Sequence, residues 1–137
     1  MRKLHIVLTL TTLAAGPAIA QDQAALVARG KYLAENVIVC QDCHTPRLET
    51  GELDTTKWLK GATLQIGPLQ TIARWHKASP DLTTSGHLFE TWGPDGILNF
   101  LMTGKNPRGG TAGPPMPSYK MSHDDAMAIV EYLKTLP

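Results

Sequence analysis

The sequence lacks the features that would point to nucleic acid, a membrane surface or a repeated architecture. Its 137 residues carry 13 basic and 12 acidic side chains. No basic run or cationic amphipathic helix stands out, so neither a nucleic-acid surface nor a membrane-binding surface is indicated. Internal repeats, low-complexity tracts and alternating strand and helix patterns are also missing. These absences leave one small domain, whose chemistry must be sought in individual residues.

The longest apolar stretch lies at the beginning of the chain. Two basic residues precede a short apolar run, and the small-residue sequence AIA ends at Ala20. This order is typical of a secretory signal over residues 1–20, cleaved after Ala20, with one domain over residues 21–137. We therefore expect a periplasmic protein without a membrane span after cleavage. An uncleaved anchor stays open as the alternative, because residues 4–20 approach the shortest membrane span.

Only two cysteines are present, and they lie three positions apart in the stretch CQDCH, residues 40–44. A zinc site would normally need a second pair of ligands, and a thioredoxin-like dithiol would need a preceding strand; the sequence favours neither. A structural disulfide would leave the histidine unexplained. Covalent haem attachment explains Cys40, Cys43 and His44 together, because one helical turn presents both thiols to a porphyrin edge and the next residue supplies an axial nitrogen.

Two regions have the apolar periodicity of helices. Residues 22–37 place apolar or small side chains on one face, where Gly30 is expected to let a second helix approach closely. Residues 122–137 begin with Ser122 and Asp125 in an arrangement that resembles a capping box. The first stripe comprises Leu26, Gly30, Leu33 and Val37, and the last comprises Ala126, Ile129, Val130 and Leu133.

A third helix is expected between these two. Pro94 suits its first turn, and Gly104 suits its end. Residues 45–92 have no sustained period, so they are expected to form long ordered loops. The predicted fold class is therefore all-α, with a few helices and long loops around one covalent haem.

A haem iron bound by His44 has a second axial position. Met116 lies between Pro115 and Pro117, which restrict the backbone and favour a fixed thioether. A neutral, soft sulfur prefers Fe(II), and methionine ligation raises the reduction potential. Met116 is the predicted ligand, while Met121, a histidine and an open position remain alternatives.

The order of these features resembles that of class I monohaem cytochromes c. The resemblance covers essentially the whole chain after the signal. It is closest to bacterial cytochromes of alcohol and aldehyde dehydrogenase systems. The segments that carry it are CQDCHTP, SPDLT, TWGPDGILNFLMTG, PPMPSY and DDAMAIVEYLKTLP.

The resemblance implies roles for individual residues. The two cysteines would form thioether bonds, and His44 and Met116 would bind the iron. The backbone carbonyl of Pro46 would accept a hydrogen bond from the axial histidine ring and so fix its tautomer. Trp92 would lie near the haem propionates, with ordinary core packing as the alternative. The first and last helices would cross at Gly30.

The function implied is electron transfer, without catalytic activity of the protein itself. Single electrons would pass from a dehydrogenase to an oxidase or another cytochrome. Two alternatives stay open: a fixed cytochrome subunit of a dehydrogenase complex, and a haem protein whose sixth ligand dissociates for gas binding or catalysis. Residues 47–77 are long for a minimal cytochrome, and they are expected either to shape a partner surface or to cover the haem edge.

Overall fold

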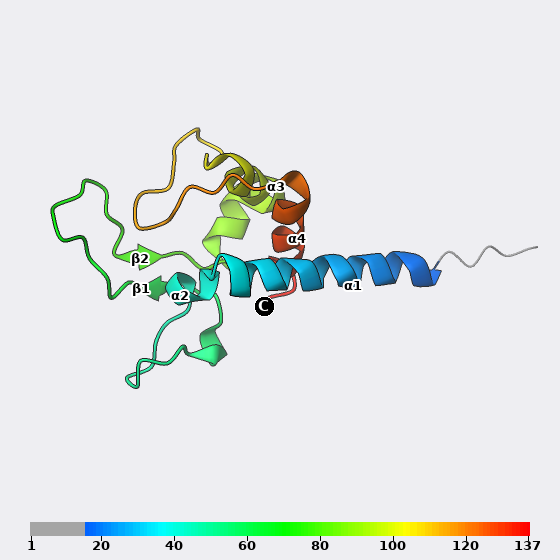
Figure 1. Ribbon diagram of the computed structural model, residues 1–137, viewed down its shortest axis with the longest axis horizontal. Helices are drawn as coiled ribbons and strands as arrows, with labels where there is room; N and C mark the ends of the chain where they lie inside the picture. Colours follow the sequence, from blue (N-terminus) through cyan, green and yellow to red (C-terminus); the bar gives the residue numbers. More distant parts are fainter. Residues whose placement is uncertain (1–15) are drawn as a thin grey trace, which may run out of the picture.

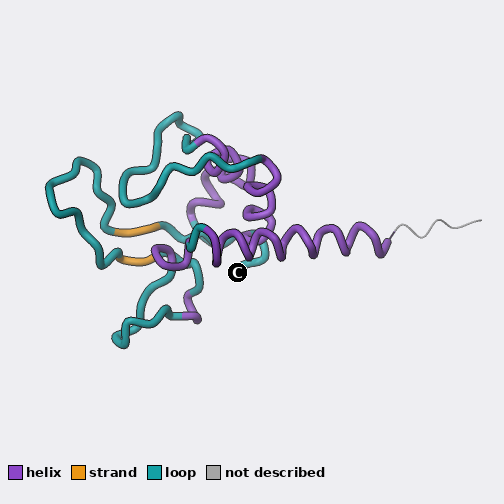
Figure 2. The backbone as a smooth tube through the Cα atoms, viewed as in Figure 1, coloured by secondary structure: helices purple, strands orange, loops and turns teal. Residues whose placement is uncertain are grey.

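The computed structural model describes the backbone of residues 16–137 and the side chains of residues 21–137 (Figure 1). The chain is mostly helical, which confirms the predicted fold class (Figure 2). None of the helices in this part of the chain has both the length and the apolar character needed to cross a bilayer. The predicted signal, residues 1–20, lies largely outside the described residues, and its cleavage stays a prediction. The elements are α1 (Gly16–Tyr32), η1 (Leu33–Val37), α2 (Cys40–His44), η2 (Thr55–Lys57), β1 (Ala62–Thr63), β2 (Ala78–Ser79), α3 (His87–Thr103) and α4 (His123–Leu133).

Helix α4 begins and packs as its sequence predicts. The Ser122 hydroxyl accepts a hydrogen bond from the backbone N–H of Asp125 at 3.2 Å, which satisfies one free donor of the first turn. The predicted apolar stripe is buried, with no member more than 3% exposed. Helix α4 therefore forms one wall of the core.

Helix α1 crosses α4 at Gly30, as predicted (Figure 1). A Cβ atom at Gly30 would overlap the backbone carbonyl of Ala128 and lie 2.9 Å from the Cβ of Tyr132. Beside the crossing, Arg29 Nη2 lies 3.0 Å from Asp125 Oδ1. The absence of a side chain at Gly30 thus sets how closely the two helices approach.

The first helix changes its winding before it reaches the cysteines. From Leu33 to Val37 the backbone is a π-helix, whose wider turn shifts the positions that follow. Val37, predicted on the buried face, is consequently 53% exposed, so that part of the prediction is wrong. Val39 then adopts the left-handed conformation (φ 47°, ψ 50°), and the chain turns directly into α2.

Helix α3 begins earlier than predicted, at His87, and is kinked. Gly93 has φ 65° and ψ 174°, outside the helical region, and Pro94 opens the second half. The helix ends as predicted, because Gly104 takes a left-handed conformation (φ 72°) and its N–H donates to the carbonyl of Phe100 at 2.8 Å.

The long region before α3 is mainly loop, as predicted, but it contains a short antiparallel hairpin. Ala62 pairs with Ser79, and Thr63 pairs with Ala78. Residues 64–77, named here the arm, connect the two strands and project from the body of the molecule (Figures 1 and 2).

Candidate functional site

The stretch CQDCH forms a short helix of its own, α2. Cys40 and Cys43 are three positions apart, so they are neighbours on the helix surface. Both thiols are free and half-buried. Burial raises the pKa of the Cys40 thiol to about 12, and its side chain packs against the core. One turn of helix therefore offers two neighbouring, half-buried thiols for covalent attachment.

His44, the last residue of α2, has the burial and the hydrogen bond at one ring nitrogen that are typical of a metal-binding histidine. Its side chain is buried, and Nδ1 lies 2.8 Å from the backbone carbonyl oxygen of Pro80. A carbonyl only accepts, so Nδ1 carries the donated proton and Nε2 keeps its lone pair. Burial also lowers the pKa of His44, which favours this neutral state. A neutral ring oriented through one nitrogen and free at the other suits axial ligation.

The contact with Pro80 corrects the role predicted for Pro46. The Pro46 carbonyl accepts instead from the backbone N–H of Asp54 at 2.8 Å. Thr45 is extended (φ −118°, ψ 132°), so the chain leaves α2 and carries Pro46 into a separate loop. The hairpin then brings Pro80 back to the histidine ring from 36 positions further along the chain.

Two hydrogen bonds hold the hairpin against α2, and a third joins its two strands through the Ser79 side chain. The Ser79 hydroxyl donates to the carbonyl of Cys43 at 2.6 Å and accepts from the N–H of Ala62 at 3.0 Å. The N–H of Gly61 donates to the carbonyl of His44 at 2.8 Å. Both strands are thereby tied to the helix, and the residue after Ser79 is positioned beside the axial histidine.

Thr45→Val is expected to lower the free energy of unfolding by about 1–3 kcal/mol. Thr45 is 1% exposed, and its hydroxyl accepts from the backbone N–H of Leu59 at 2.9 Å. Valine keeps the shape but leaves that buried N–H without an acceptor. Denaturant unfolding of the haem-loaded protein measures the loss, and Thr63→Val at an exposed position is the control, with an expected change below about 0.5 kcal/mol. Equal values for both variants would contradict the role of this hydroxyl.

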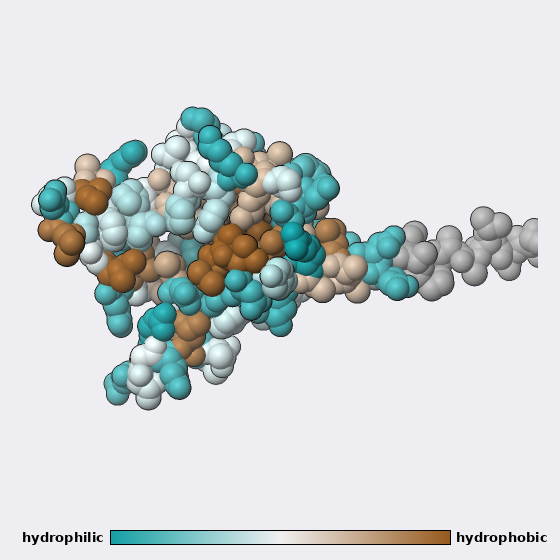
Figure 3. All heavy atoms as spheres, viewed as in Figure 1, coloured by the Kyte–Doolittle hydropathy of each residue, from teal (hydrophilic) through white to brown (hydrophobic). Residues whose placement is uncertain are grey.

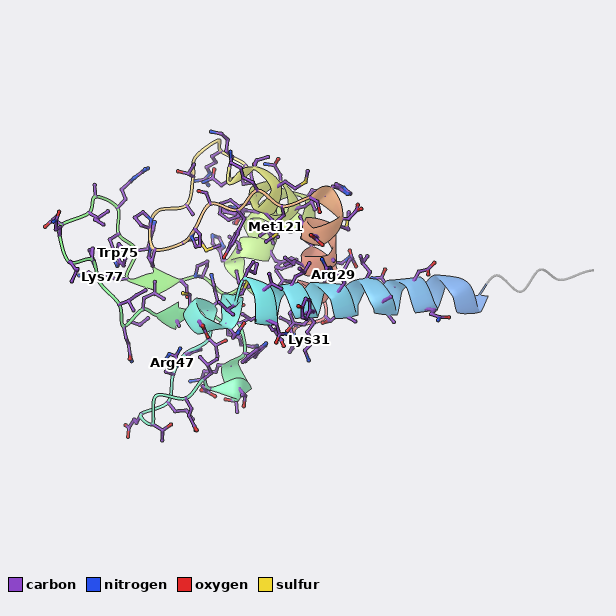
Figure 4. All side chains as sticks on the ribbon, viewed as in Figure 1. Arg29, Lys31, Arg47, Trp75, Lys77 and Met121 are labelled. Atoms are coloured by element: carbon purple, nitrogen blue, oxygen red, sulfur yellow. The ribbon has the colours of Figure 1, made fainter. Side chains whose placement is uncertain are left out.

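The two candidate methionines lie in different surroundings. Met116 is half-buried at a bend of the loop between α3 and α4. The neighbouring carbonyl of Pro114 accepts from the N–H of His76 at 2.8 Å, which joins this loop to the arm. Met121 packs against the core at the entry of α4, and its N–H donates to the carbonyl of Leu101 at 3.1 Å (Figure 4). Axial ligation by Met116 stays a prediction.

Trp92 packs in the core at the kink of α3. Its ring centroid lies 5.3 Å from that of Phe100, with the planes tilted by 54°. This contact agrees with the packing alternative for Trp92. A contact with haem propionates stays a prediction.

Trp75, on the arm, was not singled out by its sequence pattern (Figure 4). Its indole Nε1 is buried and has no acceptor among residues 16–137. Such a donor costs about 1–3 kcal/mol unless it is paired. A haem carries carboxylate groups that accept hydrogen bonds, so this orphaned donor, the two thiols and the prepared histidine together fit that group. The sequence could not have identified Trp75 as a candidate site residue, because the surrounding loop has no apolar periodicity; only the burial of its indole N–H in the structure reveals it.

A second polar cluster, also missed by sequence reasoning, joins η1, η2 and α4. The Tyr132 hydroxyl donates to the Glu35 carboxylate, and Trp58 Nε1 donates to the same oxygen at 3.1 Å. Burial raises the pKa of the Tyr132 hydroxyl, so it remains a donor. The Gln41 amide donates to the Glu35 carbonyl at 2.8 Å, and the cluster thereby braces α2 from the side of the first helix.

Comparison with known proteins agrees with this geometry. Residues 27–137 match the cytochrome c family. The chain is 32% identical over 132 residues to the diheme cytochrome c-type protein of Cereibacter sphaeroides, covering 91% of this chain and 41% of that protein. It is 29% identical to the fructose dehydrogenase cytochrome subunit of Gluconobacter japonicus (80% of this chain, 22% of that protein). It is also 29% identical to the cytochrome c subunit of the alcohol dehydrogenase (quinone) of Gluconobacter oxydans (81% and 24%).

The chain therefore spans less than half the length of these curated relatives. The family match covers, in one continuous segment, α2 (the attachment helix), the arm, the loop between α3 and α4 that contains Met116 (the methionine loop), and α4. A cytochrome c domain carries covalent haem c, and the only two cysteines provide one attachment site for it. The sequence pattern, the prepared histidine and the match together show that the chain belongs to the cytochrome c family and serves in electron transfer.

Proposed function

We propose that the protein is exported to the periplasm and carries single electrons from a dehydrogenase to a respiratory acceptor. The observation that carries the proposal is the buried, neutral His44, held at Nδ1 by Pro80 and free at Nε2 beside two free thiols. The names of two relatives support a dehydrogenase as the donor, since both are cytochrome subunits of dehydrogenases.

Bound haem supplies one-electron exchange between Fe(II) and Fe(III). The chain's own residues hold its surroundings constant during that exchange. His44 is fixed by the hairpin through Pro80, and Met116 is restrained by its two flanking prolines. Ligands that stay in place in both redox states leave little to rearrange, which suits a carrier without catalytic activity.

Two exposed valines offer a contact surface next to the attachment helix. Val37 is 53% and Val39 is 42% exposed, immediately before Cys40 in the chain. Figure 3 shows apolar surface where α1 approaches α2. A small apolar surface beside the redox centre suits brief contacts with partner proteins, whose interfaces are small when the complex is transient.

Covalent attachment is tested by intact mass. The exported protein should have the mass of residues 21–137 plus one haem, and the haem should survive acid–acetone extraction. Cys40→Ser and Cys43→Ser should each weaken or prevent maturation, because each removes one thioether bond. Release of free haem from the wild-type protein by extraction would sink the attachment proposal.

The donor is tested by substrate-driven reduction. An extract of the source organism lacking this gene is supplied with an alcohol or an aldehyde, and purified haem-loaded protein is added. We expect the haem to be reduced only when the substrate is present. Reduction that is independent of every substrate would argue against a dehydrogenase donor.

A fixed dehydrogenase subunit is the second candidate. Two relatives are named as such subunits, and the chain spans 22% and 24% of their lengths. Size-exclusion chromatography of a native extract separates the two cases. A free carrier should elute at the size of the chain alone, whereas a subunit should elute together with dehydrogenase activity.

A further inference from the structure

The arm, residues 64–77, exposes large aliphatic side chains near its tip. Leu69 is fully exposed, Ile66 is 55% exposed and Ile72 is 45% exposed. These residues lie within one short stretch, and no other part of residues 16–137 covers them. Figure 3 shows the resulting apolar surface at the end of the described molecule opposite the N-terminal end of α1. Clustered exposed aliphatic side chains are typical of interaction sites.

The arm also lies in one of the two long stretches of residues 21–137 without acidic residues, the other being residues 96–123. No aspartate or glutamate occurs between Asp54 and Asp81. The rest of residues 21–137 contains twelve acidic and seven basic side chains. The stretch that contains the arm and its base therefore carries four positive side chains and no negative one, whereas the other acid-free stretch carries three positive side chains. The basic residues of this stretch are Lys57, which pairs with Asp54, and Lys60, Arg74 and Lys77, which have no ion pair within residues 16–137.

Hydrogen bonds join the arm and its base to α2 and to the loop between α3 and α4 that contains Met116. At its base the N–H of Leu64 donates to the carbonyl of Lys77 at 2.8 Å, and the adjoining Ser79 bonds the carbonyl of Cys43. Further along, the N–H of His76 donates to the carbonyl of Pro114 in the methionine loop at 2.8 Å. A protein that binds the arm is thereby brought close to α2, which carries Cys40, Cys43 and His44.

We propose that the arm is the docking element for the redox partner protein, and that the partner presents acidic groups around a small apolar patch. This inference rests on the electron-transfer function proposed above. Opposite charge would steer the encounter, and burial of the Leu69 side chain would slow dissociation. A protein is favoured over a membrane because the arm's bonds reach the attachment helix and the methionine loop, which a lipid anchor does not require.

The test uses haem-loaded protein in the substrate-driven reduction assay. Leu69→Ser is matched with Leu48→Ser, an exposed leucine outside the arm. Arg74→Glu with Lys77→Glu is matched with Lys105→Glu with Arg108→Glu, an equal charge reversal at exposed residues of the other acid-free stretch, which separates the arm from that stretch. We expect the arm variants to be reduced about tenfold more slowly, a size typical of lost steering. The controls should stay within roughly twofold of the wild type.

Three further measurements make the result specific. Reduction by dithionite and the midpoint potential should be the same in all variants, which shows that the haem environment is intact. Added salt should slow reduction of the wild type but hardly affect the arm charge-reversal variant. Sedimentation with phosphatidylglycerol vesicles should leave the wild type in the supernatant.

Each remaining outcome decides against the inference. Equal rates for arm variants and wild type would overturn docking while leaving the electron-transfer function intact. A wild type that the extract never reduces would overturn the proposed function, and docking with it. Vesicle binding that is lost in Leu69→Ser would identify a membrane as the partner of the arm and overturn a protein partner.

Discussion

Met116→Ala is expected to open the second axial position of the haem iron, so that added imidazole or cyanide binds readily and the thioether charge-transfer band disappears. Met116→His should keep a low-spin haem if the loop can place the ring. Its potential should fall by a few hundred millivolts, within the span of roughly 0.8 V that axial ligands cover. Imidazole donates more strongly than a neutral thioether and therefore favours Fe(III). Optical spectra and redox titrations of the haem-loaded proteins measure both effects.

Met121→Ala is the matched control for these experiments. Met121 packs against the core, and its backbone N–H is bound to the carbonyl of Leu101. Its loss should reduce stability moderately while the spectrum and the potential stay close to those of the wild type. If Met121→Ala loses the thioether band while Met116→Ala keeps it, the ligand assignment is wrong and the methionine loop contributes only packing.

Local patterns in the sequence predicted the parts of the fold that depend on neighbouring residues. The Ser122 cap, the buried stripe of α4 and the end of α3 at Gly104 all occur where the pattern placed them. The attachment motif was equally local, because Cys40, Cys43 and His44 lie on one short helix. In each case the determining contacts span only a few positions along the chain.

Contacts between distant residues were not predictable in the same way. Pro46 was chosen as the partner of the axial histidine, but a hairpin within a region without periodicity brings Pro80 to the ring instead. The buried indole of Trp75 and the cluster around Glu35 depend on the same kind of long-range packing. No spacing rule connects residues that meet only after such a loop has closed.

A change in helix winding explains the remaining error. The apolar stripe of the first helix was extended to Val37 on a period of 3.6 residues. The π-helix over Leu33–Val37 has a wider turn, so Val37 emerges at the surface. The π-helix is followed directly by Val39 and by α2, so the departure from the 3.6-residue period lies immediately before the haem-attachment helix.

Gly30→Ala is expected to lower the free energy of unfolding by about 3 kcal/mol, at the upper end of what overpacking usually costs. The added methyl group would overlap the backbone carbonyl of Ala128, which is part of α4 and cannot rotate away as a side chain would. The two helices must therefore separate, and the core between them loses contacts. Denaturant unfolding of the haem-loaded protein measures the change.

The higher helix propensity of alanine would by itself stabilise the variant, which is opposite to the loss expected from the overlap, so the sign of the measured change tests the close crossing. Alanine is favoured over glycine inside a helix by about 1 kcal/mol, so without a close helix crossing the variant would be more stable than the wild type. Gly67→Ala is the matched control, because a Cβ there meets nothing within 4 Å. It should be neutral or stabilising by up to about 1 kcal/mol. Ala128→Gly should not rescue Gly30→Ala, since the overlapping atom belongs to the backbone; rescue would mean that the contact is made by side chains and that the helices are not held at this distance by Gly30.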